Sequence, residues 1–501
     1  MLNARMTRVV EEHGLLGEIQ NGFRQGRSTS DSIFILNTIL ARCSAKRQRA
    51  HLAFLDLQKA YDTVDRGLLW TKLSGLGFKG KFLSSVKSFY CGDYVSSNVG
   101  GASTKEVYLG RGVRQGCSMS PMLFALYLSS LGHDLSRASQ GFVINGTVTI
   151  SALFFADDIV LIARSAAGLK ELLALVNRHC GYLKMTLSVS KSKVLSGAME
   201  TWELFKDGEV MGVLDKVLTF KYLGVDCELS PFKGAAAFQK RALRLANQFR
   251  ATCIRIARDG SDVTDVALAL WQNVALPTIL YGCESVPFTS STLDALERQQ
   301  ACVGKFALGL PVSAPNAAVR AILGLRSVKE VVYERQLNFV VRVRDQPPGR
   351  WSHEAFMDQL GDWTSPFMDN LVKMKKELGV VGTMVSSRHV RIILDNFFTC
   401  DLDAKIRALG LRGLQAVDKR RRHRHVQECE ASQVTLPLHL GLLPLLFLFL
   451  ALFLLLLILI LSAPLAPAPL APASAPVPTA LAPASSAFAL SVPAPCFSYL
   501  C

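Results

Sequence analysis

The stretch that most constrains this chain is SALFFADDIVLIA, beginning at Ser151, where two adjacent carboxylates interrupt an apolar run. Residues 150–155 and 159–163 have the composition of buried β-strands, so the residues between them are expected to form a hairpin turn. A single aspartate would need no further explanation, because aspartate is a common turn former. Two neighbouring carboxylates repel each other, and a bound cation relieves that repulsion. Asp157 and Asp158 therefore indicate a site for a hard divalent metal.

A third carboxylate lies in HLAFLDLQKAYDTVD, residues 51–65. The run LAFLDL has the pattern of a strand, and Asp56 falls at its end, ahead of a segment with a helical pattern. Three carboxylates on two neighbouring strands could hold a pair of Mg²⁺ ions about 4 Å apart, which activate a 3′-hydroxyl and stabilise a leaving pyrophosphate. The combination predicts nucleotidyl transfer.

The charge balance agrees with a polyanionic partner. The 501 residues carry a formal net charge of +16, which favours nucleic acid or an anionic membrane surface without choosing between them. Residues 240–259 form a basic, apolar-striped pattern, which predicts a helix with one face packed and the other able to contact phosphates; an ordinary solvated face is the alternative. The 12 cysteines include no C-x-x-C pair, and the N-terminus has no apolar signal region. Reduced thiols in the cytosol or nucleus are the simpler interpretation.

Three motifs occur in a fixed order: F-x-D-x-x-x-A-Y-D at 54–62, RGVRQGCSMSPMLFALYL at 111–128 and FADD at 155–158. They resemble motifs A, B and C of reverse transcriptases, and their individual residues are similar to those of the non-LTR (LINE-type) retrotransposon family. Other matching stretches are QNGFRQGRSTSD at 20–31, LSVSKSKV at 187–194, FKYLGV at 220–225, LPTILYGCE at 276–284 and LERQQ at 296–300. These are similar to the fingers motif, motif D, the closing palm motif, the thumb and the connector, respectively.

The resemblance implies an α+β right-hand polymerase fold with partial fingers, a palm built on an antiparallel sheet, and a helical thumb. The expected organisation is incomplete fingers and palm at 1–230, a helical thumb or connector at 231–345, an unassigned helical region at 346–435 with a basic block at 419–425, a hydrophobic segment at 440–461 and a disordered Pro/Ala-rich tail at 462–501. The family's R-P-I-S-type segment and upstream endonuclease are expected to be missing. The alternative to an active enzyme is therefore a truncated, inactive retroelement remnant that only binds nucleic acid.

The C-terminal segments admit two interpretations. Residues 440–461 are apolar and about the ~20 residues needed to span a bilayer, so they are a candidate transmembrane helix. Because an anchor at this position has no evident use for a polymerase, the biased composition favours a non-coding or out-of-frame extension. The expected location is nuclear or cytoplasmic, or a membrane if 440–461 spans one. No protein partner is indicated.

The resemblance also implies roles for individual residues. Asp56 and Asp157 would bridge two Mg²⁺ ions, with Mn²⁺ as an alternative metal. Asp158 would contribute less directly, and the backbone carbonyl of Leu57 would complete the shell. Lys191 occupies the position of the motif D lysine, which would protonate or neutralise the departing pyrophosphate; a solvated loop lysine is the alternative.

Further residues are expected to contact the substrates, which would be an RNA template, a DNA primer or target, and dNTPs. Tyr61 occupies the place of an aromatic gate against the ribose 2′-hydroxyl, although such a residue could equally be a core aromatic. Gln115 and Gly116 precede a helix N-terminus, which is favourable for phosphate. Arg24 and Arg27 are expected to contact phosphate or template, with an exposed surface charge as the alternative for each.

Overall fold

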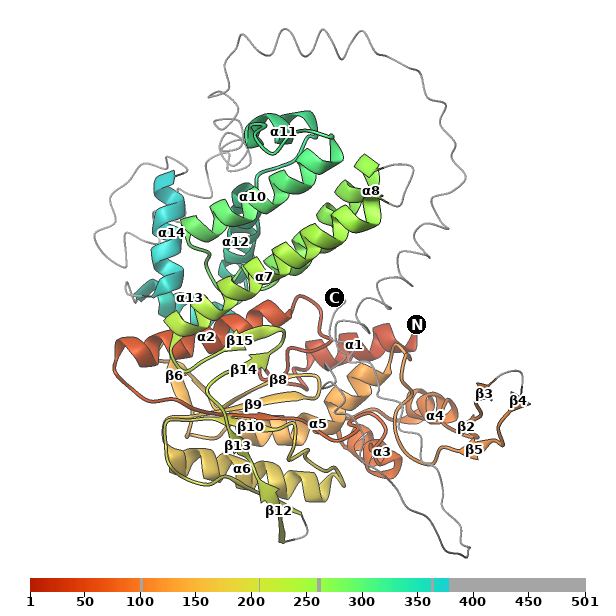
Figure 1. The fold of residues 1–501 in the computed structure, drawn as a ribbon. Helices are drawn as coiled ribbons and strands as arrows, with labels where there is room; N and C mark the ends of the chain where they lie inside the picture. The colour runs from red at the N-terminus through yellow and green to blue at the C-terminus, as the bar shows by residue number, and fades with distance from the viewer. Residues whose placement is uncertain (100–101, 207, 259–262, 362–364, 378–501) are drawn as a thin grey trace, which may run out of the picture. The chain divides into compact units, whose positions relative to one another are not determined.

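The computed structural model describes residues 1–377 apart from 100–101, 207, 259–262 and 362–364 (Figure 1). These residues belong to one compact unit. The predicted segments beyond residue 377, including the basic block, the hydrophobic segment and the Pro/Ala tail, lie outside the described residues. In the described part of the chain, no helix is both long enough and apolar enough to cross a membrane.

A five-stranded sheet carries the predicted motifs. Its spatial order is β13 (Asp215–Lys216), β10 (Lys193–Leu195), β1 (His51–Leu55), β9 (Asp158–Ala163) and β8 (Ala152–Phe155). The three pairings from β8 to β10 are antiparallel, and β13 joins β10 in parallel. Every residue of the central strand β1 is buried, as expected for a strand that is covered on both faces. The predicted antiparallel sheet is therefore present.

Helices and short hairpins surround this sheet. Helix α6 lies against one face and contacts β9 and β1 (Figure 1), while α5 is buried along most of its length, as its continuous apolar sequence requires. The helices are α1 (Leu2–Glu12), α2 (Thr29–Ala45), α3 (Arg66–Gly75), α4 (Gly80–Ser88), α5 (Ser120–Ser136) and α6 (Ala166–Tyr182). The hairpins pair β2 (Tyr94–Val95) with β5 (Val107–Tyr108), β3 (Asn98–Val99) with β4 (Ala102–Ser103), β6 (Phe142–Ile144) with β7 (Val148–Ile150), β11 (Glu203–Lys206) with β12 (Glu209–Val213), and β14 (Phe220–Tyr222) with β15 (Val225–Cys227).

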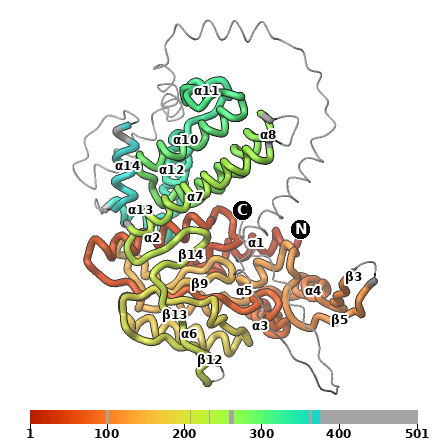
Figure 2. The backbone as a smooth tube through the Cα atoms, viewed as in Figure 1, coloured from red at the N-terminus to blue at the C-terminus, as the bar shows by residue number. Residues whose placement is uncertain are grey.

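Among the described residues after β15, the regular elements are all helices, joined by loops (Figure 2). The elements are α7 (Pro231–Arg258), α8 (Val263–Leu270), the π-helix η1 (Trp271–Ala275), α9 (Leu276–Leu280), α10 (Ser290–Ala307), α11 (Asn316–Ile322), α12 (Val328–Arg344), α13 (Trp351–Gly361) and α14 (Pro366–Glu377). The change from mixed structure to helix falls at Pro231, where the helical thumb or connector is predicted to begin. The domain limits themselves remain predictions.

The helical region is tied to α2 by buried polar contacts. The guanidinium of Arg342 on α12 donates to both carboxylate oxygens of Asp31, at 2.8 and 3.1 Å, and Asp31 is 1% exposed. The Tyr281 hydroxyl, which follows α9, donates to Thr29 Oγ1 at 2.8 Å. Asp31 is buried whereas the Arg342 side chain is 36% exposed, so loss of Arg342 would leave a buried carboxylate without its counter-charge. Helices α2 and α12 are therefore firmly coupled.

The segment before α2 packs against the β8–β9 hairpin. Phe154 donates its backbone N–H to Ile19 O at 2.8 Å, and Asn21 donates to Phe154 O at 2.9 Å. Gly22 approaches the turn so closely that a Cβ atom there would lie 2.3 Å from Ala156 N. Only a residue without a side chain fits this contact, because backbone atoms cannot yield as a flexible side chain can.

We expect Gly22→Ala to lower the free energy of unfolding by about 1–3 kcal/mol, as is usual for overpacking. The measurement is denaturant unfolding of the purified variant. The control is Gly181→Ala in α6, where an added Cβ meets nothing within 4 Å. That change should be neutral or stabilising by up to about 1 kcal/mol, because alanine is the better helix former. Equal stabilities of the two variants would contradict the packing described here.

Candidate active site

The two adjacent carboxylates lie in a tight turn. Phe155 at the end of β8 pairs with Asp158 at the start of β9, so Ala156 and Asp157 form a two-residue connection. Ala156 has φ 59°, in the left-handed region that costs a residue with a side chain about 1–2 kcal/mol. Strained backbone of this kind concentrates at functional sites, where surrounding contacts impose it. The hairpin predicted from the apolar strands is thus confirmed.

The register of the sheet brings the third carboxylate to the same place. Strands β1 and β9 pair from His51 opposite Ala163 to Leu55 opposite Ile159. One step further along this register, Asp56 faces Asp158. Directly opposed residues in antiparallel strands have Cα atoms about 4.5–5.5 Å apart. Residues separated by about a hundred positions therefore meet at one end of the sheet.

The electrostatics of this end are unfavourable for three ionised carboxylates. Burial raises the pKa of Asp157, and the nearby charge of Asp56 raises it further. Burial, followed by the charges of Asp157 and Asp56, raises the pKa of Asp158 to about 7. The pKa of Asp56 is also raised by burial, against the lowering effect of Lys191. Because the Asp158 side chain is still exposed, a cation from solution can reach the group.

The donor atoms suit a hard divalent cation. Oδ2 of Asp56 is buried and has no hydrogen-bond partner, and Lys191 Nζ lies 3.7 Å from it. Leu57 pairs with Leu187 in an isolated bridge, and its side chain is buried. Because this side chain is apolar, only the backbone carbonyl of Leu57 could bind a metal. Carboxylate and carbonyl oxygens fit Mg²⁺ or Mn²⁺ better than Zn²⁺. Among the described residues, no three or more His, Cys, Asp or Glu side chains form a group that could hold a metal ion as it stands.

The loop that carries Lys191 is attached to the end of β1. The Asp56 backbone N–H donates to Ser192 Oγ at 3.1 Å, and the Asp56 carbonyl accepts from Ser188 N at 2.8 Å. The Lys191 side chain is 69% exposed, so its ammonium is free to reach a substrate beside Asp56. Ser192 was not among the residues that the sequence singled out. The sequence feature that could have identified Ser192 was its position in the LSVSKSKV motif.

Tyr61 packs as a core aromatic, and its role as a gate against the ribose 2′-hydroxyl stays a prediction. Its ring stacks on Phe124 of α5 with centroids 4.9 Å apart and an interplanar angle of 16°. Burial and, after it, the charge of Asp157 raise the pKa of its hydroxyl. Tyr61 is therefore an aromatic residue packed against α5, and Phe124 supports its ring.

The loop before α5 is also close to motif A. Gln115 Nε2 donates to Asp62 Oδ1 at 2.9 Å, and both groups are exposed. Gly116 has φ 85°, a conformation that glycine adopts without strain. The helix itself begins at Ser120, whose hydroxyl donates to Arg114 O at 2.6 Å. Gln115 is thus held beside Asp62 of motif A, in the loop that leads into α5.

The structure does not bring Arg24 and Arg27 to a substrate surface. Arg24 is 6% exposed, and its guanidinium donates to both oxygens of Glu11 at 2.8 and 2.7 Å. Arg27 pairs with Glu18 in the same way. Neither the phosphate role nor the exposed charge expected from the sequence describes these arginines. Both neutralise acidic residues within the N-terminal segment, because their short loop folds back on it.

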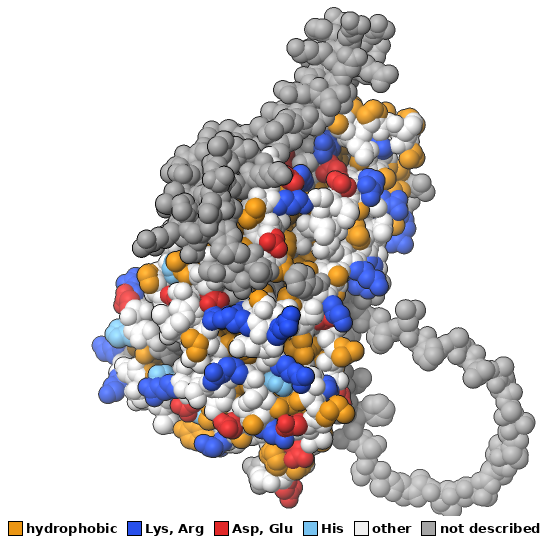
Figure 3. All heavy atoms as spheres, turned by 90° about the vertical axis from the view of Figure 1, so that its left-hand side faces the viewer, with side chains coloured by type: hydrophobic (Ala, Val, Ile, Leu, Met, Phe, Trp, Pro, Cys, Tyr) orange, Lys and Arg blue, Asp and Glu red, His pale blue; other side chains and the backbone are white. Residues whose placement is uncertain are grey.

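Helix α7 has the two faces expected from its sequence. Phe238, Ala242 and Ala246 recur at intervals of four residues and are buried, whereas Lys240 and Arg244 are exposed. Lys and Arg side chains are also spread over the face of the molecule shown in Figure 3, with acidic side chains among them. The exposed face of α7 is therefore available to phosphates.

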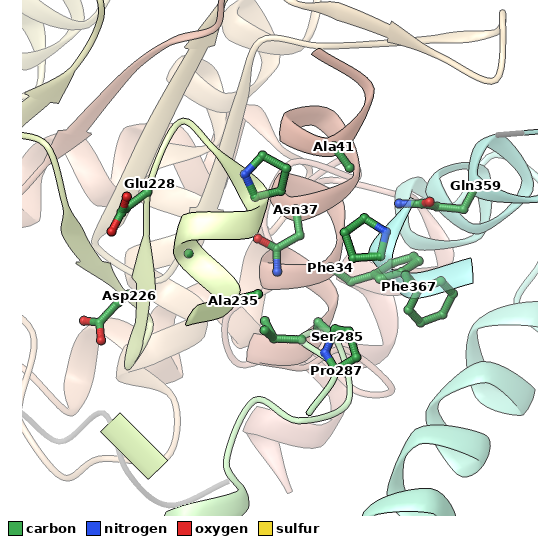
Figure 4. Close-up of a pocket in the computed structure, with 14 residues that line it drawn as sticks. Phe34, Asn37, Ala41, Asp226, Glu228, Ala235, Ser285, Pro287, Gln359 and Phe367 are labelled. Carbon is green, nitrogen blue, oxygen red and sulfur yellow. The ribbon is translucent and has the colours of Figure 1, made fainter. Parts of the chain in front are cut away.

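A pocket lies where α2, the start of α7 and the α13–α14 region meet (Figure 4). Phe34 and Phe367 line one side, and Asp226 and Glu228 line the other. None of the predicted site residues lines it. The pocket therefore does not contribute to the acidic site.

The antiparallel strands carry three carboxylates at one end of the sheet, one directly after β1 and two at the β8–β9 turn. This arrangement is typical of the palm of a nucleotidyl-transferring polymerase. Comparison with known proteins agrees: residues 1–227 match the family model described as "Reverse transcriptase (RNA-dependent DNA polymerase)". These residues are a reverse transcriptase domain, and its relatives show it to be of the non-LTR retrotransposon type.

Two curated relatives illustrate that type. The "Retrovirus-related Pol polyprotein from type-1 retrotransposable element R2" of Popillia japonica is 27% identical over 356 residues, covering 67% of this chain and 48% of that protein. The "Retrovirus-related Pol polyprotein from type-2 retrotransposable element R2DM" of Drosophila melanogaster is 27% identical over 216 residues, covering 41% and 20%. The chain thus spans about half of the first relative's length. Among solved structures, apo telomerase from Candida tropicalis matches at 11% identity with a TM-score of 0.36, over 78% of this chain and 60% of that one.

The raised pKa of Asp158 predicts a pH-dependent stability in the presence of a chelator. The folded protein binds this proton more tightly than the unfolded chain, whose aspartates titrate near pH 4. The stabilising contribution is therefore complete below about pH 4 and is lost as the pH rises through about 7. Asp158→Asn should match the wild-type melting temperature near pH 4 and exceed it at pH 8, as measured by thermal unfolding.

The control for this experiment is Asp294→Asn, because Asp294 is an exposed residue of α10. Its difference from wild type should not change with pH over the same range. A constant difference for Asp158→Asn would contradict the electrostatic strain assigned to the turn.

Proposed function

We propose that this chain is an RNA-directed DNA polymerase that joins dNTPs to a primer 3′-hydroxyl. The observation that carries the proposal is the register of β1 and β9, which sets Asp56 beside the Asp157–Asp158 turn. Mutually repelling carboxylates, one of which has a buried oxygen without a hydrogen bond, are an environment that a divalent cation stabilises. Reverse transcriptases depend on such ions, and the two-ion arrangement with Mg²⁺ or Mn²⁺ is part of this proposal.

Each residue has a part in the proposed reaction. Asp56, Asp157 and, less directly, Asp158 would hold two ions together with the carbonyl of Leu57. When bound, the ions activate the attacking 3′-hydroxyl and stabilise the charge on the leaving pyrophosphate. Lys191, which lies 3.7 Å from Asp56, would neutralise or protonate that pyrophosphate.

The substrates would be bound by surfaces around the acidic turn. Gln115 and Gly116, in the loop that leads into α5, would contact the incoming dNTP beside the helix N-terminus, which favours phosphate. The exposed Lys240 and Arg244 of α7 would contact the backbones of an RNA template and a DNA primer or target. The location proposed for this reaction is the nucleus or the cytoplasm.

We expect Asp157→Asn to abolish primer extension on an RNA template in the presence of dNTPs and Mg²⁺. Rates should fall by more than the roughly 10–100-fold typical of a group that only supports a metal ligand. Asp294→Asn on α10 is the matched control and should extend primers at the wild-type rate.

The outcomes of this assay separate the two candidate functions. Extension that persists in Asp157→Asn would refute the assignment of the site. A wild-type protein that binds template and primer without extending them would instead support the inactive, nucleic-acid-binding remnant.

Tyr61 would exclude ribonucleotides through its ring, which Phe124 supports. We expect Tyr61→Ala to lower the preference for dNTP over NTP, measured as the ratio of kcat/KM values, on the order of 10- to 100-fold. Tyr61→Phe keeps the stacked ring and should keep the preference. Loss of discrimination in Tyr61→Phe would show that the hydroxyl, rather than the ring, is responsible.

A further inference from the structure

We infer that Gln20 is a positioning residue that fixes the acidic turn for metal binding. This inference rests on the function proposed above. Gln20 lies in the N-terminal segment, 136 residues from the turn, and is 2% exposed. It touches the turn through its side chain, and no carboxylate of the site is its partner. Its effect on the site would therefore be exerted through the backbone of Ala156.

The Gln20 carboxamide binds both polar groups of Ala156. Oε1 accepts from Ala156 N at 3.0 Å, and Nε2 donates to Ala156 O at 3.3 Å. The same Oε1 accepts from Gly22 N at 2.8 Å, so one side-chain oxygen joins the N-terminal segment to the turn. A primary amide can do this because it carries both a donor and an acceptor, which no aliphatic or carboxylate side chain does.

The position of these hydrogen bonds is what links Gln20 to the chemistry. Ala156 has φ 59°, which an alanine adopts only when its surroundings impose it. The next residue is Asp157, so the orientation of the Ala156 peptide sets the direction in which that carboxylate leaves the backbone. A displacement of about 1 Å in a catalytic group can cost on the order of a hundredfold in rate.

Gln20 is itself held in place by buried contacts. Arg24 Nη1 donates to Gln20 O at 3.1 Å, and the same guanidinium is paired with Glu11 on α1. Gly22 packs against Ala156 with no room for a side chain. Asn21 Nδ2 donates to Ser32 Oγ on α2 at 2.9 Å. The segment is thus a rigid support, and its two helices anchor the carboxamide.

The test compares Gln20→Met, which keeps the side-chain length and removes all three hydrogen bonds, with Gln20→Glu, which keeps both acceptor contacts. The matched control is Gln300→Met in α10, since Gln300 is equally buried and makes two hydrogen bonds, with Trp271 Nε1 and Arg326 O. Four quantities are measured in the full-length proteins: Mn²⁺ affinity by electron paramagnetic resonance without nucleic acid, the Mg²⁺ concentration for half-maximal primer extension, kcat, and the melting temperature.

We expect Gln20→Met to weaken Mn²⁺ binding and to raise the half-maximal Mg²⁺ concentration by about 10- to 100-fold, the range typical of residues that support metal ligands. Gln20→Glu should recover part of both losses. Gln300→Met should lower the melting temperature by a similar amount and leave the metal dependence unchanged. If Gln20→Met does not fold, the comparison of Gln20→Glu with wild type and Gln300→Met decides the question.

Two results would overturn the inference, and they differ from each other. If wild-type protein binds Mn²⁺ and extends primers, and the Gln20 variants do so with the same metal dependence, Gln20 has a structural role only and the proposed function stands. If the wild-type protein binds no Mn²⁺ at the acidic turn, the proposed function and the inference both fail.

Discussion

The antiparallel pairing of β1 with β9 is the constraint on which the rest of this structure depends. A sheet has a side-chain period of two, so a slip of one residue would turn Asp56 to the opposite face from Asp158. The five residues of β1 are all buried, and five of the six residues of β9 are buried too. Burial of these apolar side chains therefore fixes the register, and the register in turn fixes where the carboxylates meet.

The acidic turn keeps its conformation although its carboxylates repel each other. Burial and mutual charge raise the pKa of Asp157 and Asp158, so the ionised state is unfavourable without a counter-charge. The apolar strands and the Gln20 contacts keep the turn in place despite this repulsion, and they do so through groups that are not ionised. Lys191 is the nearest cation to Asp56, but its exposure leaves its charge largely screened by water. The turn is thus held by uncharged contacts, and a counter-charge at its carboxylates would relieve their repulsion.

The sequence predicted the elements better than their contacts. The β8–β9 hairpin and the strand ending at Asp56 could be predicted because apolar runs bounded by turn residues are local signals. The amphipathic faces of α7 followed from its periodicity in the same way. Arg24 could not be predicted, because an arginine near a motif is equally compatible with phosphate and with a carboxylate from another element. Here Glu11, thirteen residues earlier, is the partner. Gln20 was missed for the same reason, since its partner lies in another part of the chain.

The QNGFR stretch at residues 20–24 can now be understood as one structural unit. Gln20 binds the Ala156 peptide, Gly22 allows the backbones to touch, and Arg24 returns to bind the Gln20 carbonyl. These three contacts require an amide at residue 20, a glycine at residue 22 and a long cationic side chain at residue 24. A turn at residues 22–23, where Phe23 has φ 57°, lets the chain fold back so that Arg24 reaches the Gln20 carbonyl. The QNGFR stretch, which resembles a fingers motif, therefore contacts the β8–β9 turn of the palm in this chain. Its arginine has no phosphate to bind because Glu11 already satisfies it, and its glutamine is the residue that reaches the acidic turn.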